Sequence, residues 1–188
     1  MSISNDHTLV IGGCRSGKSR YALALAERYT GRSRIFLATS VPQDAEMEER
    51  VRRHRLERGG GWETVEVPLR LPEAVLESSG RAGVLLVDCI TLWISNLLFE
   101  KLPEDEIASR VEKLIESVQD SRCPVILVTN EVGGGVVPEN ALARQFRDVV
   151  GGANQRIAAA SDRVVWVAAG IPVPIKGEER GERGKRDR

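Results

Sequence analysis

Gly12-Gly-Cys-Arg-Ser-Gly17-Lys18-Ser19 is the stretch that decides how the rest of this sequence is interpreted. It matches the spacing G-x-x-x-x-G-K-[ST] of a phosphate-binding loop, or P-loop. The apolar residues 8–11 precede it, and residues 18–29, rich in alanine and leucine, follow with a helical pattern. A P-loop requires a strand before it and a helix after it, so a chance glycine turn is the weaker interpretation.

The residue types in this stretch suit the binding of a nucleoside triphosphate. Glycines let the backbone curl so that successive N–H groups point at one phosphate, and the helix N-terminus adds partial positive charge. Lys18 can reach the β- and γ-phosphates, and the Ser19 hydroxyl can ligate Mg²⁺. The candidate nucleotide-binding residues are therefore Gly12, Gly13, Cys14, Arg15, Ser16, Gly17, Lys18 and Ser19.

Short apolar runs alternate with longer helical patterns along the chain. We expect strands at residues 8–11, 34–38, 62–67, 83–87, 124–128 and 163–168. Helices are expected at residues 18–29 and 44–58, in two stretches split near Pro103, and at 139–160 with an interruption at Gly151-Gly152. This alternation is typical of an α/β protein with a mostly parallel central sheet and helices on both faces. One catalytic domain over residues 1–176 would precede a charged tail, 177–188, without fixed structure.

Composition narrows the function classes. Among 188 residues, 27 are basic and 27 acidic, which argues against a dedicated nucleic-acid binder. No apolar run approaches the ~20 residues of a transmembrane helix. The three cysteines contain no C-x-x-C pair and are typical of free thiols in a reducing, cytoplasmic compartment.

Polar residues follow several of the expected strands. Asp88 follows the strand at 83–87 and could hold a metal through water, although it could instead cap the helix that begins near Ile90. Thr129, Asn130 and Glu131 follow the next strand. Ligands of open α/β sheets lie at the carboxyl ends of the strands, so these residues, Thr39-Ser40 and the P-loop should line one crevice.

His54 lies on an arginine-rich helical pattern. At helical spacing it shares a face with Met47, Val51 and Arg58, and Arg55 is adjacent. A neutral imidazole among guanidinium groups suits attack on a phosphate. A half-buried structural histidine is the competing interpretation, and residue chemistry alone favours it.

The sequence resembles the bifunctional adenosylcobinamide kinase and adenosylcobinamide-phosphate guanylyltransferase family of cobalamin biosynthesis. The resemblance covers about residues 8–175. Besides the P-loop, the matching pieces include Leu37-Ala-Thr-Ser40 and Arg50-Val-Arg-Arg-His54-Arg55. Val128-Thr-Asn-Glu-Val-Gly133 followed by Val137-Pro-Glu-Asn140 is far more specific than the P-loop, which many families share.

The resemblance implies a single-domain RecA-like P-loop fold and two reactions. Adenosylcobinamide first takes the γ-phosphoryl group of ATP or GTP, and GMP then moves from GTP to that phosphate with release of pyrophosphate. Transfer passes through a histidine–GMP intermediate, which places the nucleophile at His54. The family's nucleotide contacts correspond here to the P-loop with Lys18, to Ala38, Thr39, Ser40, Arg55, Leu56, Glu57, Arg58, Glu66 and Asp88. Mg²⁺ would be held by Ser19 and Asp88, and the family implies a homo-oligomer, a trimer.

Three other functions are open on the residues alone. A simple P-loop kinase would leave His54 structural. A nucleic-acid-dependent motor could use the basic run at 50–58, but only 4% of residues are aromatic, which leaves few stacking platforms. A nucleotide sensor would bind without turnover.

Overall fold

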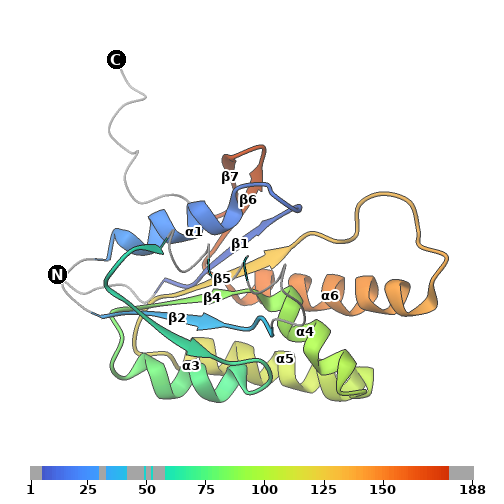
Figure 1. Ribbon diagram of the computed structural model, residues 1–188, viewed down its shortest axis with the longest axis horizontal. Helices are drawn as coiled ribbons and strands as arrows, with labels where there is room; N and C mark the ends of the chain where they lie inside the picture. Colours follow the sequence, from blue (N-terminus) through green and yellow to red (C-terminus); the bar gives the residue numbers. More distant parts are fainter. Residues whose placement is uncertain (1–5, 30–32, 42–48, 50–51, 53–57, 178–188) are drawn as a thin grey trace.

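The architecture is a mostly parallel sheet covered by helices on both faces, as seen in the computed structural model (Figure 1). The structure describes residues 6–29, 33–41, 49, 52 and 58–177. In this part of the chain the strands are β1 (Thr8–Gly12), β2 (Arg34–Ala38), β3 (Trp62–Glu66), β4 (Val84–Asp88), β5 (Val125–Asn130), β6 (Arg163–Ala168) and β7 (Ile171–Lys176). The helices are α1 (Lys18–Glu27), α3 (Leu71–Ser79), α4 (Ile90–Phe99), α5 (Glu104–Gln119) and α6 (Ala141–Ala160).

The described strands form one seven-stranded sheet in the order β3-β2-β4-β5-β1-β6-β7. Neighbouring strands from β3 to β6 run parallel, and β7 runs antiparallel to β6. All the parallel strands therefore end at one edge of the sheet, where loops from distant parts of the sequence meet. The P-loop leaves β1 in the interior of the sheet, with two strands on one side of it and four on the other.

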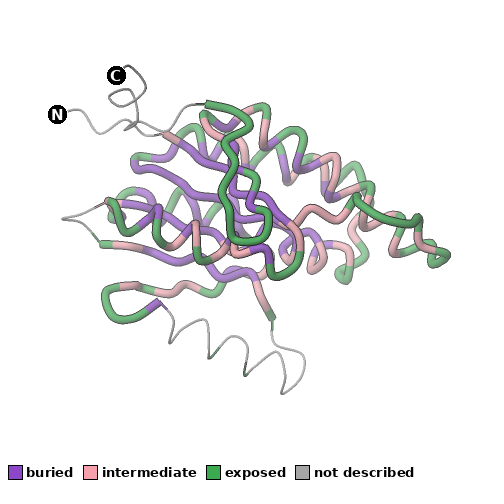
Figure 2. The backbone as a smooth tube through the Cα atoms, turned by 90° about the horizontal axis from the view of Figure 1, so that it is seen from above, coloured by how far each residue is buried: buried purple, intermediate pink, exposed green. Residues whose placement is uncertain are grey.

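Alternate residues of each strand feed two separate cores. On one face Val10, Leu86 and Ile126 pack with Ala22 and Leu25 of α1. On the other face the strands pack against α3, α4, α5 and α6, which lie together on that side in Figure 1. Figure 2 shows buried residues running through the middle of the sheet and exposed residues on the outside. Burial on both faces explains why these strands are nearly continuous apolar runs.

The expected fold is confirmed, with three differences in its elements. Helix α3 was not among the expected helices; it begins with a proline in its first turn, which a helix tolerates there. The expected interruption at Gly151-Gly152 is wrong, since α6 continues through both glycines. Strand β7 was also not expected, because Pro172 and Pro174 make residues 171–176 look unlike a strand. The predicted helix at 44–58 lies mostly outside the described residues.

Candidate nucleotide site

The first glycine of the P-loop is required by close packing. A Cβ added at Gly12 would lie 2.5 Å from the Val167 carbonyl oxygen and 2.6 Å from Ser16 Oγ. Gly17, the N-cap of α1, has φ +93°, a left-handed conformation that glycine adopts without steric cost. The loop therefore curls tightly enough to aim backbone N–H groups into its own concavity, as a phosphate cradle needs.

Lys18 is buried and held inside the loop. The residue is only 8% exposed, and Nζ donates a hydrogen bond to the Gly13 carbonyl oxygen at 3.1 Å. This contact keeps the ammonium group over the loop. When a nucleotide binds, the ammonium group can replace its hydrogen bond to the carbonyl with hydrogen bonds to phosphate oxygens. Charged phosphate acceptors bind an ammonium group more strongly than a neutral carbonyl does.

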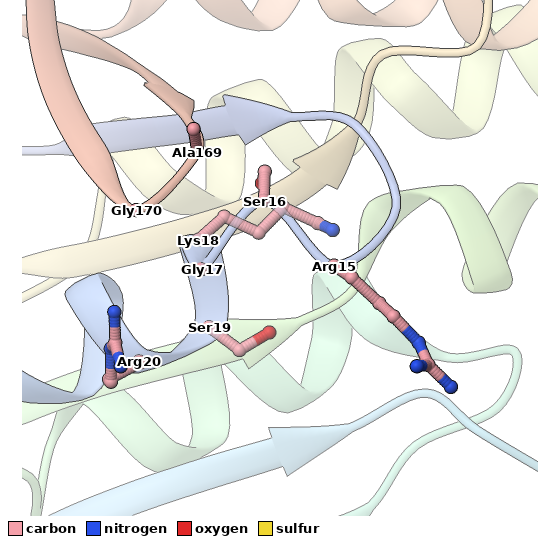
Figure 3. A pocket seen from close by; sticks show the side chains of 8 residues that line it. All are labelled: Arg15, Ser16, Gly17, Lys18, Ser19, Arg20, Ala169 and Gly170. Carbon is pink, nitrogen blue, oxygen red and sulfur yellow. The ribbon is translucent and has the colours of Figure 1, made fainter.

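A cavity of about 450 Å³ opens over the loop. It is lined by Arg15, Ser16, Gly17, Lys18, Ser19, Arg20, Ala169 and Gly170 (Figure 3). Three of these side chains are cationic and none is acidic, so the cavity suits a polyanion. The Ser16 hydroxyl is buried and makes no hydrogen bond within the described part of the chain.

Two neighbouring strand ends brace the P-loop through main-chain hydrogen bonds. The Glu131 N–H, just beyond β5, donates to the Gly12 carbonyl oxygen at 3.1 Å. The Gly170 N–H, in the turn between β6 and β7, donates to the Ser16 carbonyl oxygen at 2.8 Å. The loop is thus held from both sides, which fixes its shape before a ligand binds.

Thr39 links the ends of β2 and β4. Its hydroxyl donates to the Cys89 carbonyl oxygen at 2.7 Å and accepts from the Cys89 N–H at 2.8 Å. Asn96 of α4 donates to the Thr39 carbonyl oxygen at 2.8 Å. The backbone that leads to Ser40 is consequently fixed by buried hydrogen bonds, although Ser40 itself is only half-buried.

A second buried network orders the end of β5. Thr129 donates its hydroxyl hydrogen to Asn154 Oδ1 at 2.8 Å, and Asn154 Nδ2 donates to the Asn130 carbonyl oxygen at 3.1 Å. Thr91 of α4 accepts from the Asn130 N–H at 2.7 Å. The sequence assigned no role to Asn154 or Thr91. Both lie on the buried face of a helix, where a polar residue needs a hydrogen-bond partner, and this feature of the sequence could have indicated their role.

Asp88 lies at the end of β4, within electrostatic range of the P-loop. Burial and, to a lesser extent, the Asp88 charge raise the pKa of the neighbouring Cys89 thiol to about 12, while the Lys18 charge opposes the rise. Asp88 at the end of β4 and Lys18 at the start of α1 therefore both act on this thiol. The competing interpretation of Asp88 as a helix cap loses support, because Cys89 is the N-cap of α4 and makes no side-chain capping bond.

The remaining predicted contacts lie toward β2 and β3. Ala38 ends β2, and the exposed Glu66 ends β3, so both reach the same edge as the P-loop. Arg58 is buried; its guanidinium lies 3.7 Å from the centre of the Phe36 ring and donates to Thr64 Oγ1 at 3.2 Å. The predicted residues His54, Arg55, Leu56 and Glu57 lie outside the described residues. The P-loop, residues 38–40, Glu66 and Asp88 lie at the carboxyl edge, as expected, whereas Arg58 contacts the middle of β2 and β3.

Comparison with known proteins adds a family to this geometry. Residues 8–175 match the family described as "CobU: Cobinamide kinase / cobinamide phosphate guanyltransferase". The "Bifunctional adenosylcobalamin biosynthesis protein CobP" of Pseudomonas aeruginosa is 44% identical over 171 residues, covering 90% of this chain and 97% of that protein. The "Bifunctional adenosylcobalamin biosynthesis protein CobU" of Escherichia coli is 42% identical over 182 residues, covering 89% and 98%.

A solved structure supports the fold alone. The flagellar accessory protein FlaH of Methanocaldococcus jannaschii superposes with a TM-score of 0.54 at 13% identity, covering 93% of this chain and 79% of that one. Both have the RecA-like P-loop fold. Within the described part of the chain, no helix is both long and apolar enough to cross a membrane.

Proposed function

This chain belongs to the cobinamide kinase and cobinamide phosphate guanyltransferase family, and we propose that the crevice around its P-loop serves both reactions of that family. It is a bifunctional transferase of cobalamin biosynthesis. The observation that carries the proposal is the P-loop itself: a buried Lys18 in a cationic cavity at the edge where β2, β3 and β4 also end.

The kinase step follows from this cavity. A hydroxyl oxygen of adenosylcobinamide attacks the γ-phosphorus of ATP or GTP; the new O–P bond forms as the bond to the β–γ bridging oxygen breaks. The hydroxyl proton is lost to solvent or a base, and the nucleoside diphosphate leaves. Lys18 and the backbone N–H groups at the start of α1 would stabilise the charge that develops on the phosphoryl oxygens.

A magnesium ion fits this site chemically. Mg²⁺ in nucleotide enzymes is held by one or two protein oxygens, by water and by substrate phosphates. Ser19 lines the cavity next to Lys18, and Asp88 acts electrostatically on the same neighbourhood. We propose that the Ser19 hydroxyl and, through water, the Asp88 carboxylate hold Mg²⁺, which would neutralise phosphate charge when bound.

We assign the guanylyl transfer to His54. Its imidazole would attack the α-phosphorus of GTP and release pyrophosphate, and a phosphate oxygen of adenosylcobinamide phosphate would then displace the imidazole from GMP. Splitting the transfer in this way avoids direct attack of one polyanion on another. Arg58, four residues after His54, is anchored on Phe36 of β2 and Thr64 of β3, which holds that end of the segment on the sheet.

The family relationship also supports an assembly and a compartment. We propose a homo-oligomer, a trimer, that acts in the cytoplasm on a corrinoid. Four exposed apolar side chains on the β6–β7 hairpin, Trp166, Ile171, Val173 and Ile175, offer a surface for such an assembly. Sedimentation analysis would test the trimer: a monomer at micromolar concentration would contradict it.

The histidine intermediate is tested with His54→Asn and GTP labelled on the α-phosphate. We expect covalent GMP to vanish and guanylyl transfer to fall by about 10³-fold or more, as when other covalent nucleophiles are removed. The kinase step should keep most of its rate, because it depends on the P-loop. The adduct of the unsubstituted enzyme should be labile in acid and stable in alkali, as a phosphoramidate is.

His7→Asn is the matched control, because His7 is the other histidine of the chain. Its adduct should form normally. Covalent GMP that persists in His54→Asn would move the nucleophile elsewhere. Loss of both activities together with a lower melting temperature would instead make His54 structural.

A further inference from the structure

The cavity over the P-loop continues past Arg20 to the turn between β6 and β7, and we propose that this part binds the nucleoside of the phosphoryl donor in the kinase step. The inference rests on the proposed function. Guanylyl transfer would use a different nucleoside subsite, formed by the ends of β2 and β3 on the other side of the P-loop. One phosphate cradle would thus serve two nucleotides that approach it from opposite directions.

The order of strands separates the two subsites. Strands β6 and β7 lie on one side of β1, and β5, β4, β2 and β3 lie on the other. With neighbouring strands ~4.8 Å apart, the end of β2 is roughly 14 Å from the end of β1, and the end of β3 roughly 19 Å. The Ala169-Gly170 turn, by contrast, contacts the P-loop directly through the hydrogen bond from Gly170 to Ser16. A base at the turn cannot also contact Glu66.

The lining of the cavity indicates which part of a nucleotide it holds. Lys18 and Ser19 occupy the positions that contact the β- and γ-phosphates and the metal. The cavity does not end there, because Arg20 and the turn also line it. In the view of Figure 3, Arg20 lies on the side of Gly170, whereas Arg15 extends the other way. The α-phosphate and the nucleoside are the parts of the donor left to fill the space beside Arg20.

The backbone of the turn keeps this space open. Ala169 and Gly170 have φ values of +50° and +81°, as in the tight two-residue turns that join antiparallel strands. A Cβ added at Gly170 would lie 3.3 Å from a terminal nitrogen of Arg20. The lack of a side chain at Gly170 therefore lets the Arg20 guanidinium lie directly against the turn, and a side chain there would displace it.

The two subsites differ in their capacity to distinguish bases. Ala169 and Gly170 carry no polar side-chain atoms, so the turn offers no side-chain hydrogen bond that would distinguish adenine from guanine. Glu66 ends β3 on the other side and carries a carboxylate, which accepts hydrogen bonds from the N1–H and N2–H groups of guanine. A kinase step tolerant of both ATP and GTP and a transfer step specific for GTP follow from this difference.

The first test is Arg20→Ala, assayed for both reactions in the full-length enzyme. We expect the KM for ATP and for GTP in the kinase step to rise about tenfold, since a charged contact to the donor is lost. The KM for GTP in transfer to adenosylcobinamide phosphate should stay within about twofold, because that nucleoside lies elsewhere. Arg122→Ala, an exposed arginine before β5 at the opposite edge of the sheet, is the matched control and should change neither. An equal rise in both assays would overturn the two-subsite arrangement.

The second test locates the base directly. 8-Azido-ATP, photolysed on the enzyme, should label the tryptic peptide 164–176, which contains the turn, and excess ATP should suppress the label. Label on peptides 35–50 or 59–70 would place the adenine beside β2 and β3 and refute the proposal. An enzyme that lacked both activities would refute the proposed function instead, while label on peptide 164–176 would still show a nucleoside at the turn.

Discussion

At the scale of single residues, the site depends on a few positions at which the surrounding atoms permit only one type of residue. Gly12 has no room for a side chain, and Lys18 is buried with its ammonium group on the Gly13 carbonyl. The motif predicted these residues because it requires glycine where a side chain has no room and lysine where a positive charge must face phosphate. Asn154 and Thr91 were not predictable in the same way. Their role comes from hydrogen bonds across helices and strands that are far apart in sequence.

Asp88→Asn should weaken the dependence of both activities on Mg²⁺. The substitution keeps the shape of the side chain but removes a negative charge from the outer coordination of the metal, so about tenfold more Mg²⁺ should be needed for half-maximal rate. The measurement is a Mg²⁺ titration of kinase rate at saturating ATP. Superimposable titration curves would restrict Asp88 to a structural role.

The three cysteines should differ sharply toward a thiol reagent at pH 8. Cys14, in the P-loop, is exposed, whereas Cys89 and Cys123 are buried. Burial raises the pKa of Cys89 to about 12, so the unreactive protonated thiol dominates at every pH below that value. We expect one thiol to react rapidly in the native protein and all three after denaturation, and nucleotide should slow the rapid one. Rapid reaction of two thiols in the native state would contradict the burial of Cys89 or of Cys123.

At the scale of elements, tertiary packing decided the cases in which local patterns failed. Helix α6 contains two adjacent glycines, which predict a break, yet Val150, Ala153 and Ile157 on either side are buried against the sheet. Strand β7 contains two prolines, yet it pairs along β6. The buried parallel strands were predictable because their apolar runs suit no exposed structure. Helix α6 and strand β7, in contrast, are stabilised by packing and pairing with distant parts of the chain, which a local sequence pattern does not reveal.

Replacing the α6 glycines should therefore stabilise the protein. A Cβ added at Gly151 or Gly152 meets nothing within 4 Å, and both residues are helical. Each glycine-to-alanine change should add about 0.5–1 kcal/mol to the free energy of unfolding, through the reduced entropy of the unfolded chain. Denaturant unfolding of Gly151→Ala, Gly152→Ala and the double variant gives the measurement. A decrease in stability would mean that these glycines serve a close approach to another surface.

At the scale of the whole molecule, function follows from which strands are neighbours. The sheet order places the end of β1 between β6 on one side and β5 and β4 on the other. The P-loop is consequently hydrogen-bonded to neighbouring strand ends on both sides, and a nucleotide can approach it from either side. The sequence predicted an open parallel sheet, but not that order, since strand adjacency is decided by the packing of helices over the faces.

Truncation after Gly177 should leave the enzyme intact. Residues 178–188 contain nine charged side chains, two glycines and no apolar side chain, so the segment has nothing to bury. We expect both activities and the melting temperature to stay close to those of the full chain. A fall of several degrees, or a selective loss of one activity, would show that the segment contacts the catalytic domain.

The two prolines of β7 also bear on how the protein behaves when crowded. A sheet's outermost strand is a template on which a foreign strand can add, and from there fibrils can grow. Pro172 and Pro174 have no N–H to offer such a strand, although Ile171, Val173 and Ile175 between them are apolar and exposed. The two prolines that make β7 look unlike a strand in the sequence thus also disfavour aggregation, because they prevent the exposed apolar edge of the sheet from pairing with another chain.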